Sequence, residues 1–315
     1  MDEYEIYSVE NYDSNDFDQI YRIIIPGIIK HHDLSDDGKM RLHFRKLQEP
    51  GEKIWKSYRN KNIEIDYSDK LMQEAYILRY GALYTLPVKK FLKHHPKFQK
   101  KIHNVALYGA GPSPEVISLI NNSISHNLNT SINFIDKYEW HHIRNMILSY
   151  FEKKKDFNCS FLNHKNDFVD KPNPLNNGPY DLVVFQFSMN EIISQTCDSF
   201  GENTNSLKIN EIYEYLYKES IIPILKSLNI NGKLVFFDRL YYEYVDNFYN
   251  FISQVDSDYG LRIEYESSTE LELTDKFTRP LILTKYLNDD KKRGLIQSHK
   301  IEYKRRIFTL KHLNL

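Results

Sequence analysis

The chain has 315 residues, of which 41% are hydrophobic and 27% are charged, and its formal net charge at pH 7 is −1. This composition is typical of a globular protein with enough apolar material for one large domain or two ordinary ones. No apolar stretch approaches the roughly 18 residues of a transmembrane helix, and the acidic N-terminus does not resemble a signal peptide. Cys159 and Cys197 are the only cysteines, so no disulfide framework is expected. We therefore expect a cytoplasmic location.

The first third of the chain is predicted to be helical. Amphipathic stretches predict helices over 17–31, 39–47, 52–59, 69–84 and 86–98. Pro26 should kink the first of these or divide it in two, and Asp69 can cap the fourth. We therefore expect a helical domain in residues 1–101 that covers a cofactor cleft.

From residue 104 onward, short apolar runs alternate with amphipathic stretches, which indicates strands joined by helices. The predicted strands are 104–108, 131–135, 159–162, 182–187, 233–237, 261–267 and 280–286, the last two as an antiparallel hairpin. The predicted helices are 114–124, 139–151, 209–228 and 241–256. The expected fold is α/β: a doubly wound, seven-stranded, mostly parallel Rossmann-like sheet in residues 102–288, followed by a basic tail, 289–315.

The end of the first predicted strand organises the candidate site. Tyr108 ends this strand, and Gly109, Ala110 and Gly111 form a turn before a helix. Glycines allow the backbone to turn sharply and to approach a ligand, which the N–H groups of the new helix then face. The second strand ends in Asp136, whose carboxylate can accept hydrogen bonds from a ribose diol.

The third glycine of the dinucleotide-binding fingerprint is missing from this turn. Pro112, Ser113 and Pro114 follow the glycine pair instead, which argues against a nicotinamide or flavin cofactor and favours a nucleoside without phosphates. The turn resembles the first motif of the class I S-adenosylmethionine-dependent methyltransferases, a strand that ends in a glycine-rich loop. The resemblance covers roughly residues 102–287 and implies S-adenosylmethionine as the cofactor and methyl transfer as the reaction.

Further cofactor candidates lie where ligands bind in such sheets, beyond the carboxyl ends of the strands. In the resembled family an acid at the position of Asp136 holds the ribose, an acid or amide at the position of Asp167 meets the adenine amine, and a neighbouring apolar residue, here Phe168, covers the ring. Alternatively, Asp136 caps the next helix. Arg79, on an otherwise core-facing helix, can pair with the methionine carboxylate. The complete set of expected cofactor-binding residues is Tyr108, Gly109, Ala110, Gly111, Asp136, Lys137, Tyr138, Asp167, Phe168, Gln186, Phe187, Ser188 and Arg79.

The end of the fourth predicted strand borders the group to be transferred. Residues 187–192 lack the Asn/Asp-Pro-Pro-Tyr/Phe motif of the DNA amino-methyltransferases, and Cys197 lacks the preceding proline of the cytosine-C5 class. Asn190 and Glu191 are the catalytic candidates, with Glu191 as a general base or as a group that orients a substrate amine. Equally, Glu191 can be an acid in a first helical turn, where it complements the helix dipole.

The acceptor can be a small molecule, an RNA or a protein. Asp238, Tyr241 and Tyr242 after the fifth strand, with Tyr80 of the helical domain, are the candidate substrate-binding residues. The basic run that begins at Lys89 and ends at Lys101 can contact nucleic acid or is simply a solvated helix surface.

Adjacent histidines are a further feature of the sequence. The pairs are His31 with His32, His94 with His95, and His141 with His142. Because none has the i,i+4 spacing of a helical metal site, no metal site is expected.

Two alternatives to a methyltransferase stay open. The segment Gly-Ala-Gly-Pro-Ser-Pro at 109–114 also resembles the turn of nicotianamine-synthase-like enzymes, which transfer an aminocarboxypropyl group and carry an N-terminal helical domain. Such a transfer leaves methylthioadenosine rather than S-adenosylhomocysteine. The fold can also serve as a binding or assembly module without catalysis.

Overall fold

A computed structural model of the chain describes residues 16–59, 65–166, 178–199, 206–239, 243–255, 263–273 and 300–311. The predicted strand over 280–286 lies outside these ranges. No helix within them is long and apolar enough to cross a membrane.

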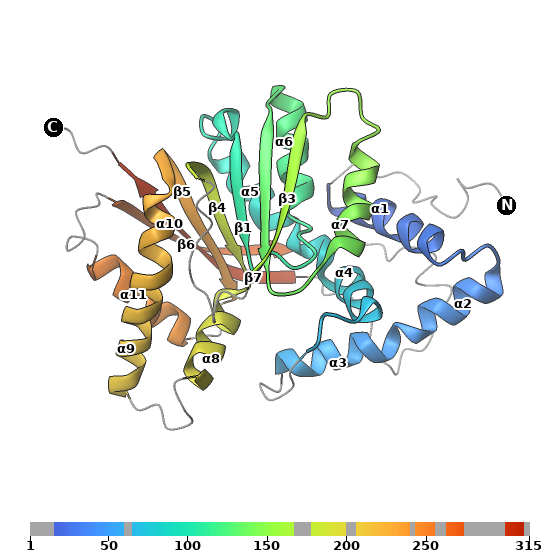
Figure 1. The fold of residues 1–315 in the computed structure, drawn as a ribbon, viewed down its shortest axis with the longest axis horizontal. Helices are drawn as coiled ribbons and strands as arrows, with labels where there is room; N and C mark the ends of the chain where they lie inside the picture. The colour runs from blue at the N-terminus through green and yellow to red at the C-terminus, as the bar shows by residue number, and fades with distance from the viewer. Residues whose placement is uncertain are drawn as a thin grey trace.

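The described residues form a seven-stranded sheet in the order β3-β2-β1-β4-β5-β7-β6 (Figure 1). The strands are β1 (Asn104–Tyr108), β2 (Thr130–Asp136), β3 (Cys159–Lys165), β4 (Tyr180–Gln186), β5 (Leu228–Arg239), β6 (Ile263–Leu273) and β7 (Lys300–Leu310). β1 to β5 are parallel, and β7 is antiparallel to both β5 and β6. The first five strands follow the order 3-2-1-4-5 of doubly wound sheets, so the predicted Rossmann-like fold is confirmed.

Helices precede the sheet and connect its strands. They are α1 (Asp16–His31), α2 (Asp37–Lys46), α3 (Gln48–Arg59), α4 (Lys70–Tyr84), α5 (Leu86–His94), α6 (Val116–His126), α7 (His141–Phe151), α8 (Met189–Ser199), α9 (Ser206–Leu216), α10 (Ile222–Lys226) and α11 (Glu243–Val255). A 3-10 turn (Gln99–Lys101) precedes β1, and a π-helical turn (Tyr217–Ile221) joins α9 to α10. α1 runs on through Pro26 as one helix, and the predicted cap of α4 is confirmed, since Asp69 accepts a hydrogen bond from the Leu71 N–H at 2.9 Å.

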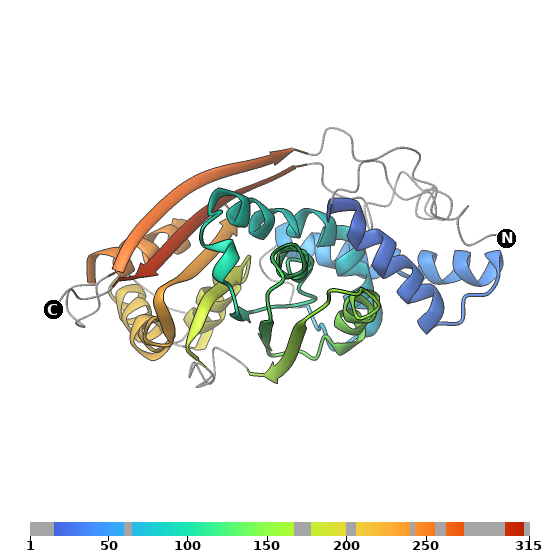
Figure 2. The same ribbon diagram turned by 90° about the horizontal axis from the view of Figure 1, so that it is seen from above.

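Helices cover both faces of the sheet (Figures 1 and 2). α6 and α7 pack on one face, and α1, α4 and α5 pack against these two helices in the same apolar cluster. α8 to α11 pack on the other face in a second cluster. Along β1, Val105 and Leu107 belong to the first cluster, while Ala106 and Tyr108 belong to the second, as the alternation of a strand requires. The N-terminal helices therefore share a core with the sheet.

The prediction of a basic tail is wrong for residues 300–310, because these residues form β7 inside the sheet. Its bases are paired: Arg305 lies 3.3 Å from Glu266 of β6, and Arg306 pairs with Asp246 of α11. Both arginines are buried, which is rare for arginine unless it is paired with an acid. Basic composition therefore concealed a strand whose charges are neutralised by acids on adjacent elements.

Candidate functional site

The predicted site lies at the carboxyl ends of the parallel strands. β1 lies between β2 and β4, and the chain leaves β1 for α6 on one face and leaves β4 for α8 on the other. In open α/β sheets, ligands bind at such a switch point.

The glycine turn after β1 has the backbone conformation that the sequence predicts. Gly109 and Gly111 both have positive φ, at 57° and 52°. A Cβ at Gly109 would lie 2.5 Å from the Cβ of Ser188, so this glycine lets the loops after β1 and β4 touch. A Cβ at Gly111 would meet only the Trp140 ring, at 4.0 Å, so there is space beside this second glycine.

Asp136, at the end of β2, is tied to the glycine turn. Its Oδ2 accepts a hydrogen bond from the Gly111 N–H at 2.8 Å, and its Oδ1 accepts from Tyr138 N–H and Trp140 Nε1 at 2.8 and 3.2 Å. Since an ionised carboxylate offers about four lone-pair positions, one is left for a ligand hydroxyl. The cap of α7 is Trp140, so Asp136 does not take the alternative role of helix cap.

Buried charges support the turn from behind. The Arg144 guanidinium donates to the Gly111 carbonyl from Nη2 at 2.6 Å and from Nε at 3.1 Å. Burial raises the pKa of Glu115, just beyond the turn, to about 8, although Arg144 opposes this rise. Glu115 also accepts a hydrogen bond from the side-chain amide of Gln186 at 3.2 Å.

The residue after β4 is strained. Phe187 has a φ of 58°, which is unusual for a bulky residue, and its ring centroid lies 4.5 Å from that of Tyr84. On either side, Gln186 donates to the Tyr84 carbonyl at 2.8 Å and the Ser188 hydroxyl lies 3.4 Å from the Tyr108 carbonyl. The predicted residues of β1 and β4 are thus brought together, with α4 as a third partner.

Glu191 lies in the first turn of α8, among the charges of the site. It is exposed, yet the surrounding protein raises its pKa to about 7 by desolvation and by repulsion from Asp136, while Lys137 and Arg239 oppose the rise. Arg239, at the end of β5, donates to the Tyr84 hydroxyl at 2.6 Å. Asn190 next to Glu191 accepts a weak hydrogen bond on its carbonyl from Tyr244 at 3.5 Å.

A row of aromatic side chains, here termed the aromatic wall, flanks these groups. Neighbouring ring centroids along it lie 4.5 to 5.8 Å apart. Its members are Tyr67, Tyr76, Tyr80, Tyr84, Trp140 and Phe187. Sequence reasoning found only Tyr80 and Phe187, although Tyr76, Tyr80 and Tyr84 recur at the four-residue spacing that places side chains on one helix face.

The other predicted site residues differ in where they lie. Asp238 is buried rather than at the substrate, because side chains alternate along β5 and it faces the Tyr249 hydroxyl of α11, 2.5 Å away. Arg79 is buried with its guanidinium 5.3 Å from the Tyr80 ring centroid, and no described contact places it at the cofactor. Lys137 and Tyr138 lie beside Asp136, with the ammonium 5.2 Å from the tyrosine ring. Outside the described residues are Asp167, Phe168, Tyr241 and Tyr242.

The basic run from 89 to 101 is partly neutralised within the protein. Lys90 forms an ion pair with Glu270 of β6 at 2.9 Å, and His95 lies 4.0 Å from Glu266. The strand that carries these acids therefore takes up part of the charge that a nucleic acid would contact.

Comparison with known proteins gives matches among solved structures alone. No family model matches the sequence, and no curated protein does. Among solved structures, the chain is similar to the plantazolicin methyltransferase BpumL in complex with SAH, at 11% identity over 94% of this chain and 99% of that one, with a TM-score of 0.39. It is similar to precorrin-6y C5,15-methyltransferase from Geobacter metallireducens at 11% identity over 78% and 92%, TM-score 0.35, and to mitomycin 7-O-methyltransferase MmcR at 10% identity over 81% and 60%, TM-score 0.40. At this level of similarity, none of these structures assigns an activity to the chain.

Proposed function

We propose that this protein is an S-adenosylmethionine-dependent methyltransferase. The observation that carries the proposal is the glycine turn at the switch point, held by Asp136 through the Gly111 N–H. The turn lacks the third glycine that a pyrophosphate requires, while the space beside Gly111 and the remaining acceptor position on Asp136 fit a nucleoside.

The residues of the site have distinct roles in this proposal. When bound, S-adenosylmethionine supplies an electrophilic methyl group on a sulfonium. Asp136 binds the ribose and the glycine turn supports the nucleoside, while Trp140, hydrogen-bonded to Asp136, provides an aromatic surface beside both. Alignment of the acceptor with the methyl group supplies most of the rate enhancement in such a reaction.

Glu191 is the candidate base. A pKa of about 7 allows a carboxylate to accept a proton near neutral pH, which is the condition for efficient general-base catalysis. Arg239 and Tyr84, which are hydrogen-bonded to each other, border the same space and position the acceptor.

We infer a small aromatic or apolar acceptor rather than a long RNA. The aromatic wall makes this region of the protein apolar, and within it Tyr80 and Tyr84 stack on each other with their ring centroids 5.5 Å apart. The basic run is already paired in part with Glu270 and its neighbours.

Calorimetric titration with S-adenosylhomocysteine and S-adenosylmethionine tests the proposal. We expect micromolar binding by the wild type and a loss of roughly tenfold or more in Asp136→Asn, which replaces an ionised acceptor. Glu139→Gln is the matched control, because Glu139 is an exposed carboxylate three residues away. Absence of binding by the wild type, or equal binding by the wild type and Asp136→Asn, would contradict the assigned site.

Product analysis separates the reactions that share this cofactor. With an acceptor pool present, we expect S-adenosylhomocysteine to accumulate. Methylthioadenosine in its place would establish aminocarboxypropyl transfer, and binding without either product from any pool would favour a non-catalytic module.

A further inference from the structure

A cluster of histidines surrounds one buried carboxylate at a distance from the glycine turn. Glu74 of α4 is fully buried. The Nε2 atoms of His32 and His142 lie 2.8 and 2.7 Å from its Oε1, and the Nε2 of His43 lies 2.8 Å from its Oε2. His31 completes the group, with its ring centroid 4.2 Å from that of His142.

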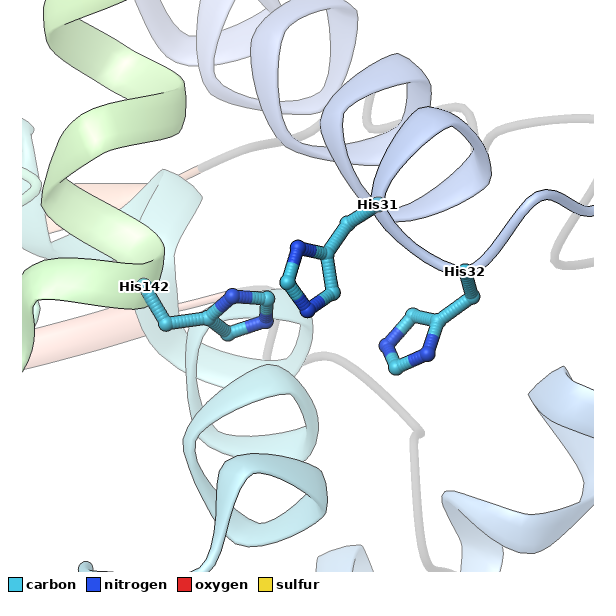
Figure 3. A group of neighbouring side chains, drawn as sticks. All are labelled: His31, His32 and His142. Atoms are coloured by element: carbon cyan, nitrogen blue, oxygen red, sulfur yellow. The ribbon is translucent and has the colours of Figure 1, made fainter.

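The cluster connects separate parts of the molecule. Figure 3 shows His31 and His32 at the end of α1 and His142 at the start of α7, with the rings of His31 and His142 directed into the space between the two helices. His43 comes from α2 and Glu74 from α4. Five side chains from α1 and the turn after it, α2, α4 and α7 thus meet at one point. This point also joins the N-terminal helices to α7, directly after the candidate site.

The donor atoms suit a transition-metal ion. One ligand atom each from His32, His43 and Glu74 lies within 4.8 Å of the other two, and the same holds for His31, His32 and His142. Two imidazoles and one carboxylate form a common ligand set for zinc and for non-haem iron. Both triads contain His32, so the two sets overlap around one position.

A bound cation also explains the number of imidazoles. A carboxylate satisfied only by hydrogen bonds needs few partners, whereas four histidines in contact would repel one another if more than one were protonated. A divalent ion lets the imidazoles remain neutral and bind through their ring nitrogens, while it compensates the buried charge of Glu74.

We propose that His32, His43 and Glu74 bind a divalent transition-metal ion, with His142 as a fourth ligand. Spacing along the chain predicts no such site, because its ligands come from the turn after α1 and from α2, α4 and α7, and only tertiary packing brings them together. The proposal is independent of the cofactor site, since it shares none of the residues assigned to S-adenosylmethionine.

The site has a route to solvent. A cavity of about 790 Å³ lies between α1 and α7, and His31 and His142 are among its lining residues. Of the proposed ligands, His32 has a side chain that is 27% exposed, while the side chain of Glu74 is fully buried. An ion can therefore reach His142 from this cavity and His32 from solvent, while Glu74 lies buried behind them.

Metal analysis of the full chain tests this proposal. The protein is purified without a metal-affinity column, dialysed against a chelator and then equilibrated with Zn²⁺, and the bound metal is measured by atomic emission. We expect about one Zn²⁺ per chain and a rise in Tm on binding. His43→Gln and Glu74→Gln should each weaken Zn²⁺ binding roughly 100-fold or more, since loss of a ligand costs at least as much as loss of its supporting contacts.

His141→Gln is the matched control, because His141 is the exposed neighbour of His142 and should leave Zn²⁺ binding unchanged. If the buried variants do not fold, His142→Gln and the ligand-field spectrum of Co²⁺ bound to the wild type still decide the question. A wild type that takes up no Zn²⁺ or Co²⁺ would overturn the proposal and leave a hydrogen-bonded network. Equal loss of binding in His141→Gln would overturn the assignment of the ligands.

Discussion

At the scale of single residues, the glycine turn combines two different requirements. At Gly109 a side chain would collide with Ser188, so packing requires glycine there. Gly111 has open space beside it, and only its positive φ favours glycine. The same residue type at two positions of one motif therefore serves packing in one case and access for a ligand in the other.

This difference predicts unequal effects of alanine at the two glycines. Gly111→Ala should cost about 1–2 kcal/mol, the strain of a left-handed backbone, and should weaken S-adenosylhomocysteine binding. Gly109→Ala should cost more, because the new Cβ would also lie 2.5 Å from the Ser188 Cβ. Urea unfolding of the two variants measures both costs, and equal destabilisation would contradict the packing role of Gly109.

The raised pKa of Glu115 leads us to expect that the stability of the protein depends on pH. Burial raises its pKa in the folded protein from 4.5 to about 8, so the folded state holds a proton that the unfolded state releases. Stability should therefore fall as pH rises from about 4.5 to about 8, by up to a few kcal/mol at about 1.4 kcal/mol per pKa unit. Glu115→Gln should flatten this fall, as measured by urea unfolding at pH 5, 6.5 and 8. Parallel curves for the wild type and the variant would show that Glu115 is ionised at low cost.

At the scale of elements, the sequence patterns predicted those segments whose burial and periodicity agree. β1 begins and ends where the apolar run does, and α4 begins at its capping Asp69. β7 was not predicted, because Arg305 and Arg306 lie within it and the acids that neutralise them belong to other elements. A composition-based prediction cannot see such partners, since they are distant in sequence.

The contact between β5 and α11 includes another buried acid, Asp238, whose stabilisation by a hydrogen bond can be tested. Asp238 is buried, and burial raises its pKa to about 6 despite the hydrogen bond from Tyr249. Tyr249→Phe removes this donor and should destabilise the protein by about 1–3 kcal/mol, the cost of a buried polar group without its partner. Tyr265→Phe is the control, because Tyr265 is 40% exposed and lies on β6. Equal thermal stability of the two variants would contradict a structural role for the Tyr249 hydroxyl.

At the scale of the whole molecule, the candidate site requires the N-terminal helices as well as the sheet. The strand ends and Asp136 could be predicted from the sequence because the rule for open α/β sheets places them together. The contribution of α4 could not, because the approach of Tyr84 to Phe187 and Arg239 depends on how the helices pack on the sheet. The histidines around Glu74 are a second example of the same dependence.

The coupling between α4 and the strand ends predicts a specific kinetic effect. Tyr84→Phe keeps the ring on Phe187 but removes the hydroxyl that Arg239 contacts. S-adenosylhomocysteine binding should change little, while turnover should fall roughly tenfold because Arg239 loses its position. Tyr150→Phe, at a half-buried position of α7, is the control. A fall in cofactor affinity with unchanged turnover would contradict the positioning role of Tyr84.

The most direct test of the central claim is hydrogen–deuterium exchange with and without S-adenosylhomocysteine. We expect slower exchange at the backbone amides of residues 109–111 and 136–138, where the glycine turn and Asp136 meet at the ends of β1 and β2. Protection confined to other segments, or no protection at saturating ligand, would contradict a nucleoside site at this edge of the sheet.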